Sequence, residues 1–228
     1  ADLFPLEAIG ALGYRHIAVS GQKGYHGVAT LSRRPIEIVD RRRFCDINDC
    51  RHISVRFSAG GKLLLLHNFR GPAGGRGPGP AINAKFPHKL DFVAEMNFIR
   101  AEHDEVSGSI LVGDLNIAPL EHDVWSHKQL LKVVSHTPVE TEGFEAMRIA
   151  GGWVDLMRHD VPPDRKLYTW WSYRAQDWAA SDRGRRLDHV WASPNLLPHF
   201  AGYDILREAR GWERPSDHVP VIARFDLD

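Results

Sequence analysis

Apolar and polar positions along the chain follow two periods, one typical of strands and one typical of helices. Apolar or alternating runs bounded by turn residues predict strands at residues 14–19, 25–32, 36–39, 52–57, 62–68, 109–115, 168–173, 187–192, 203–206 and 219–225. Apolar residues spaced by three and four positions predict helices at residues 2–12, 86–103, 123–131 and 142–149. This mixture predicts an α/β or α+β fold in which two sheets pack together with helices outside.

One segment breaks this pattern. Residues 70–80 read RGPAGGRGPGP and hold so much glycine and proline that they predict neither helix nor strand. Long loops inside a compact domain are often functional, and Arg70 and Arg76 favour contact with phosphate. The chain has no internal repeat and no linker-like composition break, and 228 residues suffice to bury a core. We therefore expect a single domain over residues 1–228.

Composition narrows the class of protein. Hydrophobic residues make up 43% of the chain and charged residues 25%, as in ordinary soluble globular proteins. No apolar run approaches the length of a membrane span, so no membrane partner is expected. Cys45 and Cys50 form neither a disulfide framework nor a zinc pattern, which favours a reducing cytoplasm. A net charge of zero argues against wholesale electrostatic binding of nucleic acid, but local basic clusters remain at Arg33 and Arg34, Arg41 to Arg43, and Arg183, Arg185 and Arg186.

The strongest local signal is residues 109–119, SILVGDLNIAP. Ile110 to Val112 predict a strand buried on both faces, and Asp114 and Asn116 follow where that strand ends. Their side chains project to the same side if the backbone stays extended. A carboxylate and an amide placed together can hold a metal, orient a water or stabilise developing charge. The structural alternative is a strand that ends in an ordinary Asp/Asn turn.

Three polar pairs occupy predicted strand ends: Asp114 with Asn116, Asp188 with His189, and Asp217 with His218. Carboxylates, an amide and imidazoles at neighbouring strand ends are what a metal-assisted phosphoester hydrolase requires. Mg²⁺ prefers hard oxygen ligands and keeps several waters, so a few carboxylates suffice. An aspartate has a reference pKa of about 3.9 and is a weak base, so a metal and a nearby histidine must assist it.

Five motifs in this order carry a family resemblance: GQKGYHGVATLSRRP, HNF with PAGG, GDLNIAP, GRRLDHVWASP and SDHVPV. Together they resemble the exonuclease III family of abasic-site endonucleases, within the endonuclease/exonuclease/phosphatase superfamily. The resemblance runs from about the first helix to the last strand. It implies a four-layered, DNase I-like α/β sandwich of two mixed sheets flanked by helices. It also implies Mg²⁺-dependent phosphodiester hydrolysis in duplex DNA, with Mn²⁺ as the alternative ion, at abasic sites and from 3′ ends.

Five residues match the family's catalytic positions. By this resemblance Asp114 orients or deprotonates the attacking water, and Asn116 supports it. Asp188 and His218 match an Asp–His pair whose imidazole contacts the scissile phosphate. The resemblance implies metal ligation by Asp114, Asn116 and Asp217.

The resemblance also implies a DNA-binding surface and a pocket for a flipped abasic sugar. Lys23 and Arg76 match backbone contacts, and Trp170 and Trp171 match the pocket, although core packing explains at least one tryptophan equally well. The residues predicted to contact DNA are Lys23, Arg70, Arg76, Trp170, Trp171 and Arg185.

Two departures from the family bear on activity. The family starts with a strand–helix–strand unit that supplies an Asn and a metal-binding Glu, and no residue ahead of Ala1 supplies them in this sequence. We therefore expect an N-terminally incomplete domain with weak or no activity. Arg70 stands where the family has a phosphate-contacting Tyr, and an arginine can bind phosphate bidentately. We expect a monomer in the cytoplasm, associated with the nucleoid.

Two other functions fit parts of the sequence. One is a phosphatase or phosphodiesterase of the same superfamily that acts on inositol phosphates or lipid head groups, which the hairpin motif and the Arg183 to Arg186 cluster disfavour. The other is a non-catalytic DNA-binding module, which the departures favour. The retained polar set at the strand ends argues against it, because a binding module does not need that set.

Overall fold

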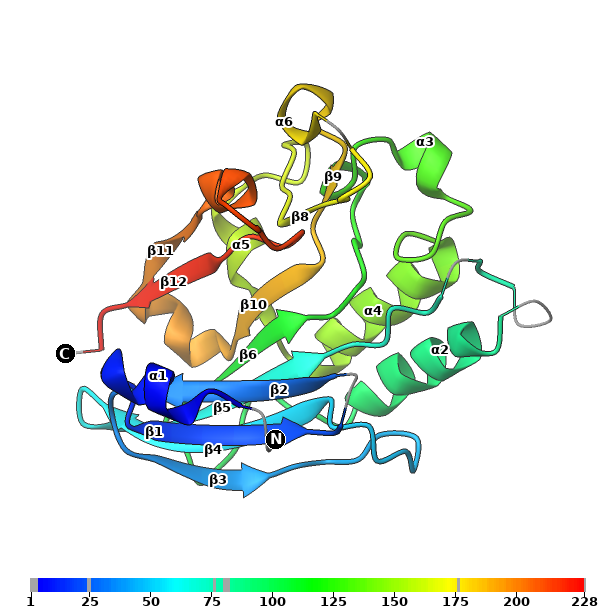
Figure 1. Cartoon of the computed structure of the whole chain (residues 1–228). Helices are drawn as coiled ribbons and strands as arrows, with labels where there is room; N and C mark the ends of the chain where they lie inside the picture. Colours follow the sequence, from blue (N-terminus) through cyan, green and yellow to red (C-terminus); the bar gives the residue numbers. More distant parts are fainter. Residues whose placement is uncertain (1–3, 24–25, 76, 80–82, 176, 228) are drawn as a thin grey trace.

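A six-stranded mixed sheet lies at the centre of the molecule (Figure 1). The computed structural model describes residues 4–23, 26–75, 77–79, 83–175 and 177–227. In spatial order, the strands of the sheet are β3 (Ile36–Asp40), β4 (His52–Ala59), β5 (Lys62–Arg70), β6 (Gly108–Asp114), β10 (Asp188–Ala192) and β7 (Val154–Asp155). Neighbours are antiparallel except β5 and β6, which are parallel. The strand predicted from SILVGD therefore occupies the interior of the sheet.

Two antiparallel ribbons cover one face of this sheet. They are β1 (His16–Gly21) with β2 (Gly27–Ser32), and β11 (Phe200–Ile205) with β12 (Val221–Phe225). The first ribbon packs Ala18 and Val28 against Ile53 and Val55 of β4. The second packs its apolar side chains against those of β5, β6 and β10 on the same face. Side chains that alternate along each central strand thus serve two different cores.

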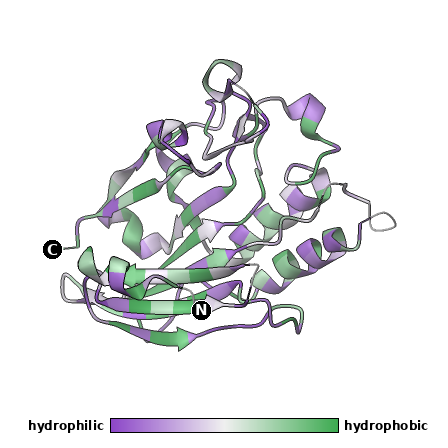
Figure 2. Cartoon of the chain, viewed as in Figure 1, coloured by the Kyte–Doolittle hydropathy of each residue, from purple (hydrophilic) through white to green (hydrophobic). Residues whose placement is uncertain are grey.

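Two helices cover the opposite face. They are α2 (Lys85–Met96) and α4 (Pro138–Gly151), and each turns an apolar stripe toward the sheet (Figure 2). Phe92 of α2 and Phe144 of α4 are 1% exposed and share a cluster with Leu111 of β6 and Trp191 of β10. The result is the predicted α/β sandwich, except that the second β layer consists of two antiparallel ribbons and not of one mixed sheet.

Shorter elements complete the chain: α1 (Leu6–Ala11), η1 (Glu121–Asp123), α3 (His127–Leu130), α5 (Leu156–Asp160), β8 (Trp170–Trp171), α6 (Trp178–Ser181), β9 (Gly184–Arg185), η2 (Pro194–His199) and η3 (Arg207–Gly211). Strands β8 and β9 pair with each other above the end of the central sheet. Within the part of the chain that the structure describes, none of the helices combines the length and the apolar character that crossing a membrane requires.

Gly113 marks the point where β6 leaves the core. Its φ of +143° is unfavourable for residues with a side chain, and a Cβ there would lie 1.9 Å from the carbonyl oxygen of Phe69. Glycine is therefore required for β6 to pair closely with β5 up to Asp114. The strand extends through this glycine rather than ending at it.

Most predicted strands are present, and the hairpin of residues 14–32 is confirmed as β1 and β2. The helix predicted at residues 86–103 was wrong in length, because α2 ends at Met96. Beyond it the backbone is engaged elsewhere: the carbonyl oxygen of Ile99 accepts a hydrogen bond from the indole nitrogen of Trp153, and the N–H of Ala101 donates to Gly151.

Two further segments differ from their predictions. The helix predicted at residues 123–131 is split, because Val124 is extended and bridges to Arg185 of β9, and the N–H of Trp125 donates to the carbonyl oxygen of Gly184. The strand predicted at residues 168–173 is reduced to Trp170 and Trp171. Its Thr169 instead bonds to Arg185 and Val219 through its backbone, which ties this segment to two different neighbours.

Candidate active site

The register of the central sheet brings two of the predicted carboxylates together. Asp114 ends β6, Asp188 begins β10, and these antiparallel neighbours place the two residues directly opposite each other. Directly opposed residues have closely spaced Cβ atoms, so their carboxylates share one small volume. Two negative charges at this spacing disfavour each other unless a cation or a proton lies between them.

Asn116 joins this pair through a left-handed backbone. Its φ is 57°, so the chain is not extended here as the sequence reasoning assumed. The turn brings its amide back to Asp114: the side-chain nitrogen donates to Asp114 Oδ2 at 2.9 Å and to the carbonyl oxygen of Gly71 at 3.1 Å. The backbone N–H of Asn116 also donates to Asp114 Oδ1 at 3.1 Å. Both carboxylate oxygens of Asp114 are thus held in place.

His218 arrives from the segment before β12 and completes the group. Its backbone forms an isolated bridge with Trp170, which fixes its position above the strand ends. The ring places Nδ1 2.8 Å from Asp188 Oδ2 and Nε2 3.8 Å from Asp114 Oδ2. The imidazole therefore lies between the two carboxylates.

Thr169 fixes the orientation of Asp188, and sequence reasoning missed it. The hydroxyl oxygen of Thr169 accepts hydrogen bonds from the backbone N–H groups of Leu187 and Asp188, both at 3.1 Å. Its own proton is then free to donate to Asp188 Oδ2, which lies 2.6 Å away. Only the position of Thr169 beside the aromatic run, inside a predicted strand, was visible in the sequence.

The electrostatics of the group follow from burial and from its partners. Burial raises the pKa of Asp114 to about 6, helped by Asp188 and opposed by His218 and Arg70. Burial alone would lower the pKa of His218, but the hydrogen bond and charge of Asp188, with Asp114 and Asp217, outweigh it and raise that pKa to about 8. At neutral pH the pair therefore consists of a carboxylate poised to take up a proton and an imidazolium.

The same atoms could hold a metal ion. One ligand atom each from Asp114, Asp188 and His218 lies within 4.8 Å of the others, the one such group of three acidic, histidine or cysteine residues found among the described residues. Two carboxylates are the hard oxygen donors that divalent cations such as Mg²⁺ prefer. The donor set therefore fits a divalent cation. The predicted ligand Asp217 is directed elsewhere, since its Oδ2 accepts the indole N–H of Trp170 at 2.9 Å.

The residues predicted to contact DNA have different environments. Lys23 and Arg70 are exposed, and Arg70 is paired in register with Asp114. Trp170 is half-buried beside Arg185, whose guanidinium lies 5.3 Å from its ring. Arg76 lies outside the described residues.

Two of these predictions do not fit the side-chain environments. Trp171 is 2% exposed and packs on Tyr168 and Trp178, so it belongs to the core rather than to a DNA-binding pocket. Arg185 is held inward: its Nη1 donates to the carbonyl oxygen of Val134 at 3.1 Å and to Ser135 Oγ at 2.8 Å. Exposure of these side chains depends on contacts distant in sequence.

A buried ion pair holds the backbone of Asn116 in place. Lys89 of α2 places Nζ 2.6 Å from Glu140 Oε1 and 2.7 Å from the carbonyl oxygen of Asn116, and both charged side chains are fully buried. Glu140 also accepts hydrogen bonds from the backbone N–H groups of Ser135 and Thr137, which caps the start of α4. The Thr137 to Glu140 spacing is a capping-box signal, but nothing in the sequence indicated Lys89.

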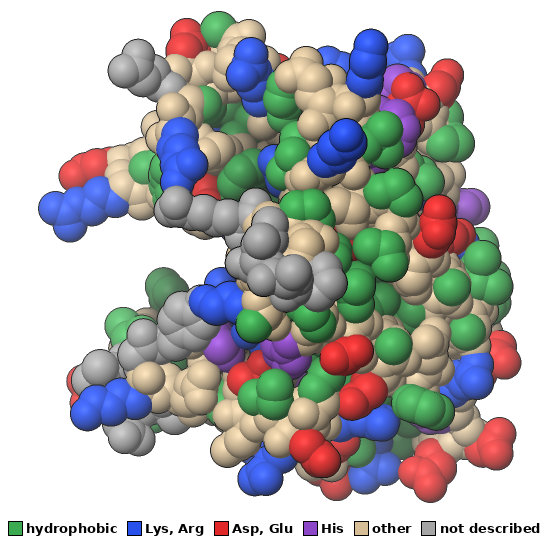
Figure 3. Space-filling view, turned by 90° about the vertical axis from the view of Figure 1, so that its right-hand side faces the viewer, with side chains coloured by type: hydrophobic (Ala, Val, Ile, Leu, Met, Phe, Trp, Pro, Cys, Tyr) green, Lys and Arg blue, Asp and Glu red, His purple; other side chains and the backbone are tan. Residues whose placement is uncertain are grey.

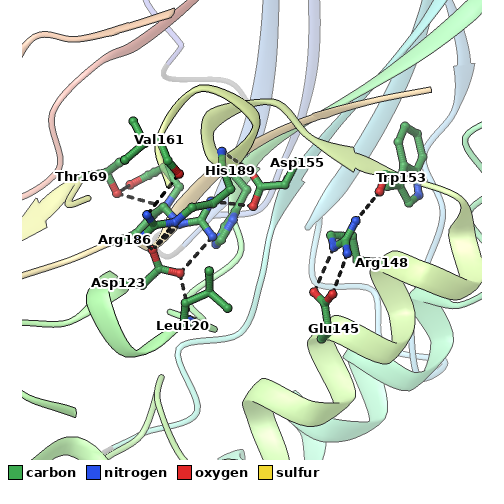
Figure 4. A network of polar contacts seen from close by, with 12 residues as sticks. Leu120, Asp123, Glu145, Arg148, Trp153, Asp155, Val161, Thr169, Arg186 and His189 are labelled. Atoms are coloured by element: carbon green, nitrogen blue, oxygen red, sulfur yellow. Dashed lines mark hydrogen bonds and ion pairs between the residues drawn. The ribbon is translucent and has the colours of Figure 1, made fainter. Parts of the chain in front are cut away.

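Arg186 belongs to a second buried network and not to a surface cluster (Figure 4). Its Nε and Nη2 each lie 2.9 Å from an oxygen of Asp123, and its Nη1 lies 2.7 Å from Asp155 Oδ2. Arg158 binds the same Asp123 carboxylate. Asp155 also caps α5 by accepting a hydrogen bond from the backbone N–H of Arg158. The network fixes the chain directly ahead of Asp188.

His189, paired with Asp188 in the sequence analysis, lies outside the site. It is 1% exposed, and its Nε2 lies 2.8 Å from the carbonyl oxygen of Ile117. Adjacent residues of a strand point to opposite faces, so Asp188 and His189 cannot both reach the same site. The partner of Asp188 is therefore His218.

Comparisons with known proteins agree with this geometry. A model of the Endonuclease/Exonuclease/phosphatase family matches residues 1–218. The chain is 30% identical over 233 residues to an exodeoxyribonuclease III of Haemophilus influenzae, covering 98% of this chain and 85% of the relative. A 3′ phosphatase from Neisseria, solved with a product DNA hairpin, has a TM-score of 0.84 at 29% identity, and an AP endonuclease from Archaeoglobus fulgidus has a TM-score of 0.84 at 27% identity. Both alignments cover 99% of this chain and 84% of the solved chain. The chain therefore belongs to the endonuclease/exonuclease/phosphatase family, as a member of the exonuclease III type.

Proposed function

We propose that the chain is a Mg²⁺-dependent hydrolase of DNA phosphodiester bonds that removes nucleotides from 3′ ends and cuts at abasic sites, with Mn²⁺ as the alternative ion. One observation carries the proposal: Asp114 and Asp188 face each other in register, with His218 between them. The relatives support DNA as the substrate, since their names specify an exodeoxyribonuclease, an AP endonuclease and a 3′ phosphatase solved with DNA.

In this proposal Asp114 orients the attacking water and accepts its proton. A pKa of about 6 keeps this carboxylate ionised at neutral pH and makes it a stronger base than an ordinary aspartate. The two hydrogen bonds from Asn116 fix which oxygen lone pairs remain for the water. Orientation of the water thus follows from the left-handed turn at Asn116.

His218 acts at the phosphate. Its Nδ1 is bonded to Asp188, so the cationic ring keeps the Nε2 proton available for a non-bridging phosphate oxygen. A donor held in this way stabilises the negative charge that grows on the phosphate in the transition state. Asp188 orients the ring and sustains its charge, and Thr169 orients Asp188.

Asp114 and Asp188 are the residues that would hold the divalent cation, with the amide oxygen of Asn116 as a further oxygen donor. When bound, Mg²⁺ supplies charge neutralisation at the phosphate and makes a coordinated water more acidic. In this proposal the exposed Lys23 and Arg70 would contact the DNA backbone, and the half-buried Trp170 would line the pocket of a flipped sugar.

The test uses three 5′-labelled duplexes of one sequence: one with a central abasic analogue, one with a recessed 3′ hydroxyl and one with a 3′ phosphate. Each is incubated with the parent chain and with Asp114→Asn, in Mg²⁺, in Mn²⁺ and in EDTA. Asp164→Asn, which changes an exposed carboxylate that forms no ion pair with a described residue, is the matched control.

We expect weak but ion-dependent cleavage at the abasic site and at the 3′ hydroxyl, lost by at least a hundredfold in Asp114→Asn and retained in Asp164→Asn. Removal of the 3′ phosphate alone would indicate a 3′ phosphatase. An inositol phosphate is assayed in parallel with the duplexes. Its hydrolysis without cleavage of any duplex would indicate a phosphatase of the same superfamily that acts on small phosphoesters. Duplex binding without any hydrolysis by the parent would refute the proposal and leave a binding module.

A further inference from the structure

A basic pocket lies beside the proposed active site and takes no part in the chemistry described above. It has a volume of about 320 Å³ and is lined by Arg41, Arg42, Arg43 and Asn48, together with the end of β1 at Ser20 and Gly21. Carboxylates are absent from its described lining, and none of the three arginines forms an ion pair with a described residue. Uncompensated positive charge in a concave surface attracts anions strongly.

The three guanidinium groups retain donors for such an anion. Arg41 is exposed and uses Nε to donate to the carbonyl oxygen of Val19 at 3.3 Å. Arg42 packs with its guanidinium 5.4 Å from the ring centroid of Phe44. Arg43 is exposed. Each guanidinium carries five N–H groups, and the one side-chain hydrogen bond that the three form with described residues is that of Arg41 Nε, so donors remain for an anion.

The segment that carries these arginines is firmly anchored. Phe44 is 1% exposed and inserts between Phe69 and Phe92, and the N–H of Cys45 donates to Glu95 on α2 at 2.9 Å. Cys45, Asp46 and Cys50 have φ values of 54°, 53° and 54°. Left-handed backbone at residues other than glycine persists only where the surrounding contacts impose it. The pocket is therefore preformed.

The position of the pocket links it to Asp114. Arg41 follows β3 directly, at the end of the sheet where Arg70 ends β5 and Asp114 ends β6. Three strand spacings of about 4.8 Å separate β3 from β6, which is about 14 Å across the sheet. Ser20 and Gly21 also line a neighbouring pocket that Arg70 borders. The basic pocket, β1 and Arg70 thus form one path toward the active site.

This end of the molecule is shaped to receive a large ligand. Figure 3 shows a deep notch between two lobes, with Lys and Arg side chains on both of them. A single nucleotide of duplex DNA advances by about 3.4 Å along the helix axis, so a span of about 14 Å corresponds to about four nucleotides.

We propose that the pocket of Arg41, Arg42 and Arg43 binds backbone phosphates of duplex DNA about four nucleotides from the phosphate that is cut. The inference rests on DNA as the substrate of the proposed function. It assigns the pocket to positioning of the duplex and not to the reaction, because phosphate contacts fix register without reading sequence. It also gives a role to an arginine cluster that the sequence analysis left unassigned.

The test measures binding separately from cleavage. Affinity for a 21-base-pair duplex with a central abasic analogue is measured in EDTA by fluorescence anisotropy, for the parent and for Arg41→Gln/Arg43→Gln. Arg15→Gln/Arg34→Gln removes the same charge from exposed positions at the opposite end of the strands and is the matched control. Thermal unfolding checks that each variant is folded.

A second series locates the contact. Single phosphates of the duplex are replaced by neutral methylphosphonates, one position at a time from two to eight nucleotides on either side of the abasic analogue. We expect the parent to lose about fivefold to tenfold in affinity near the fourth position on one side, and the double variant to show no loss there. The ratio of the parent's duplex affinity to that of the double variant should fall by about tenfold between 50 and 200 mM salt, because the variant has lost two phosphate contacts.

Other outcomes overturn the inference. Equal losses in parent and double variant at every methylphosphonate position would show that the arginines contact no defined phosphate. Arginine-dependent binding of inorganic phosphate by calorimetry, without an effect on duplex affinity, would make the pocket a site for a free anion. A parent that binds as predicted but cleaves none of the three duplexes would refute the proposed hydrolase alone.

Discussion

Lys89 provides the most direct test of how the core supports the active site. Replacement of Lys89 by methionine keeps the length of the side chain but removes the charge that lies 2.6 Å from Glu140 and the donor that lies 2.7 Å from the carbonyl oxygen of Asn116. Breaking a buried pair typically costs about 3–5 kcal/mol because one charge is left uncompensated. Glu140 keeps hydrogen bonds from Ser135 and Thr137, which places the expected loss near the lower end.

The orphaned carbonyl oxygen of Asn116 adds to this cost. A buried acceptor left without a donor costs about 1–3 kcal/mol. We therefore expect Lys89→Met to lower the free energy of unfolding by about 4 kcal/mol, measured by urea denaturation at pH 7 with an unchanged m value. Lys85→Met changes an exposed lysine of the same helix and should stay within about 0.5 kcal/mol of the parent.

A second substitution separates stability from catalysis. Glu140→Gln in the Lys89→Met background removes the buried charge but keeps an oxygen acceptor for Ser135 and Thr137, so we expect it to recover about 2 kcal/mol. We expect Lys89→Met to lower kcat at least tenfold, because the carbonyl oxygen of Asn116 loses its donor. That oxygen still has no donor in the double variant, so its kcat should also stay at least tenfold below that of the parent. Lys89→Met within 1 kcal/mol of the parent, or full recovery of kcat in the double variant, would refute this account of the pair.

Three more predictions follow from the core and the site. Burial lowers the pKa values of His52, His67 and His189 to about 3, 3 and 4. Below about pH 6.5 the unfolded chain binds a proton at each of them and the folded chain does not. Each should therefore lower the free energy of unfolding by about 1.4 kcal/mol per pH unit as the pH falls. Urea denaturation at pH 7 and pH 5 checks this, and equal stability at both would contradict it. Gly113→Ala should lower the free energy of unfolding by at least about 2 kcal/mol in the same assay, because the added Cβ would overlap the carbonyl oxygen of Phe69. Thr169→Val should lower kcat by at least tenfold with little change in KM, measured on the abasic duplex, because Asp188 loses its donor; an unchanged kcat would show that His218 alone orients Asp188.

The sequence predicted the residue types of the site better than the way in which the fold brings them together. The apolar run before Asp114 indicated a buried strand, and the polar residue types after it indicated phosphoester chemistry. What no periodicity could indicate is the register that sets Asp188 opposite Asp114, because strand pairing joins residues far apart in the chain. The extended backbone assumed at Asn116 was wrong, since only a left-handed turn returns its amide to Asp114.

The residues that were misplaced share a physical cause. Trp171 and Arg186 carry side chains that serve either a surface or a core, and the choice depends on neighbours that the sequence does not specify. A charge can be buried when geometry satisfies it, and Asp123 with Asp155 satisfies Arg186 on three of its nitrogens. The same reasoning separates Arg186 from the Arg41 to Arg43 cluster, which has no carboxylate partner among the described residues. The two sites therefore differ in their partners: Arg186 is held by two acids and stabilises the fold, whereas Arg41 to Arg43 have no such acids among the described residues and keep donors for an anion.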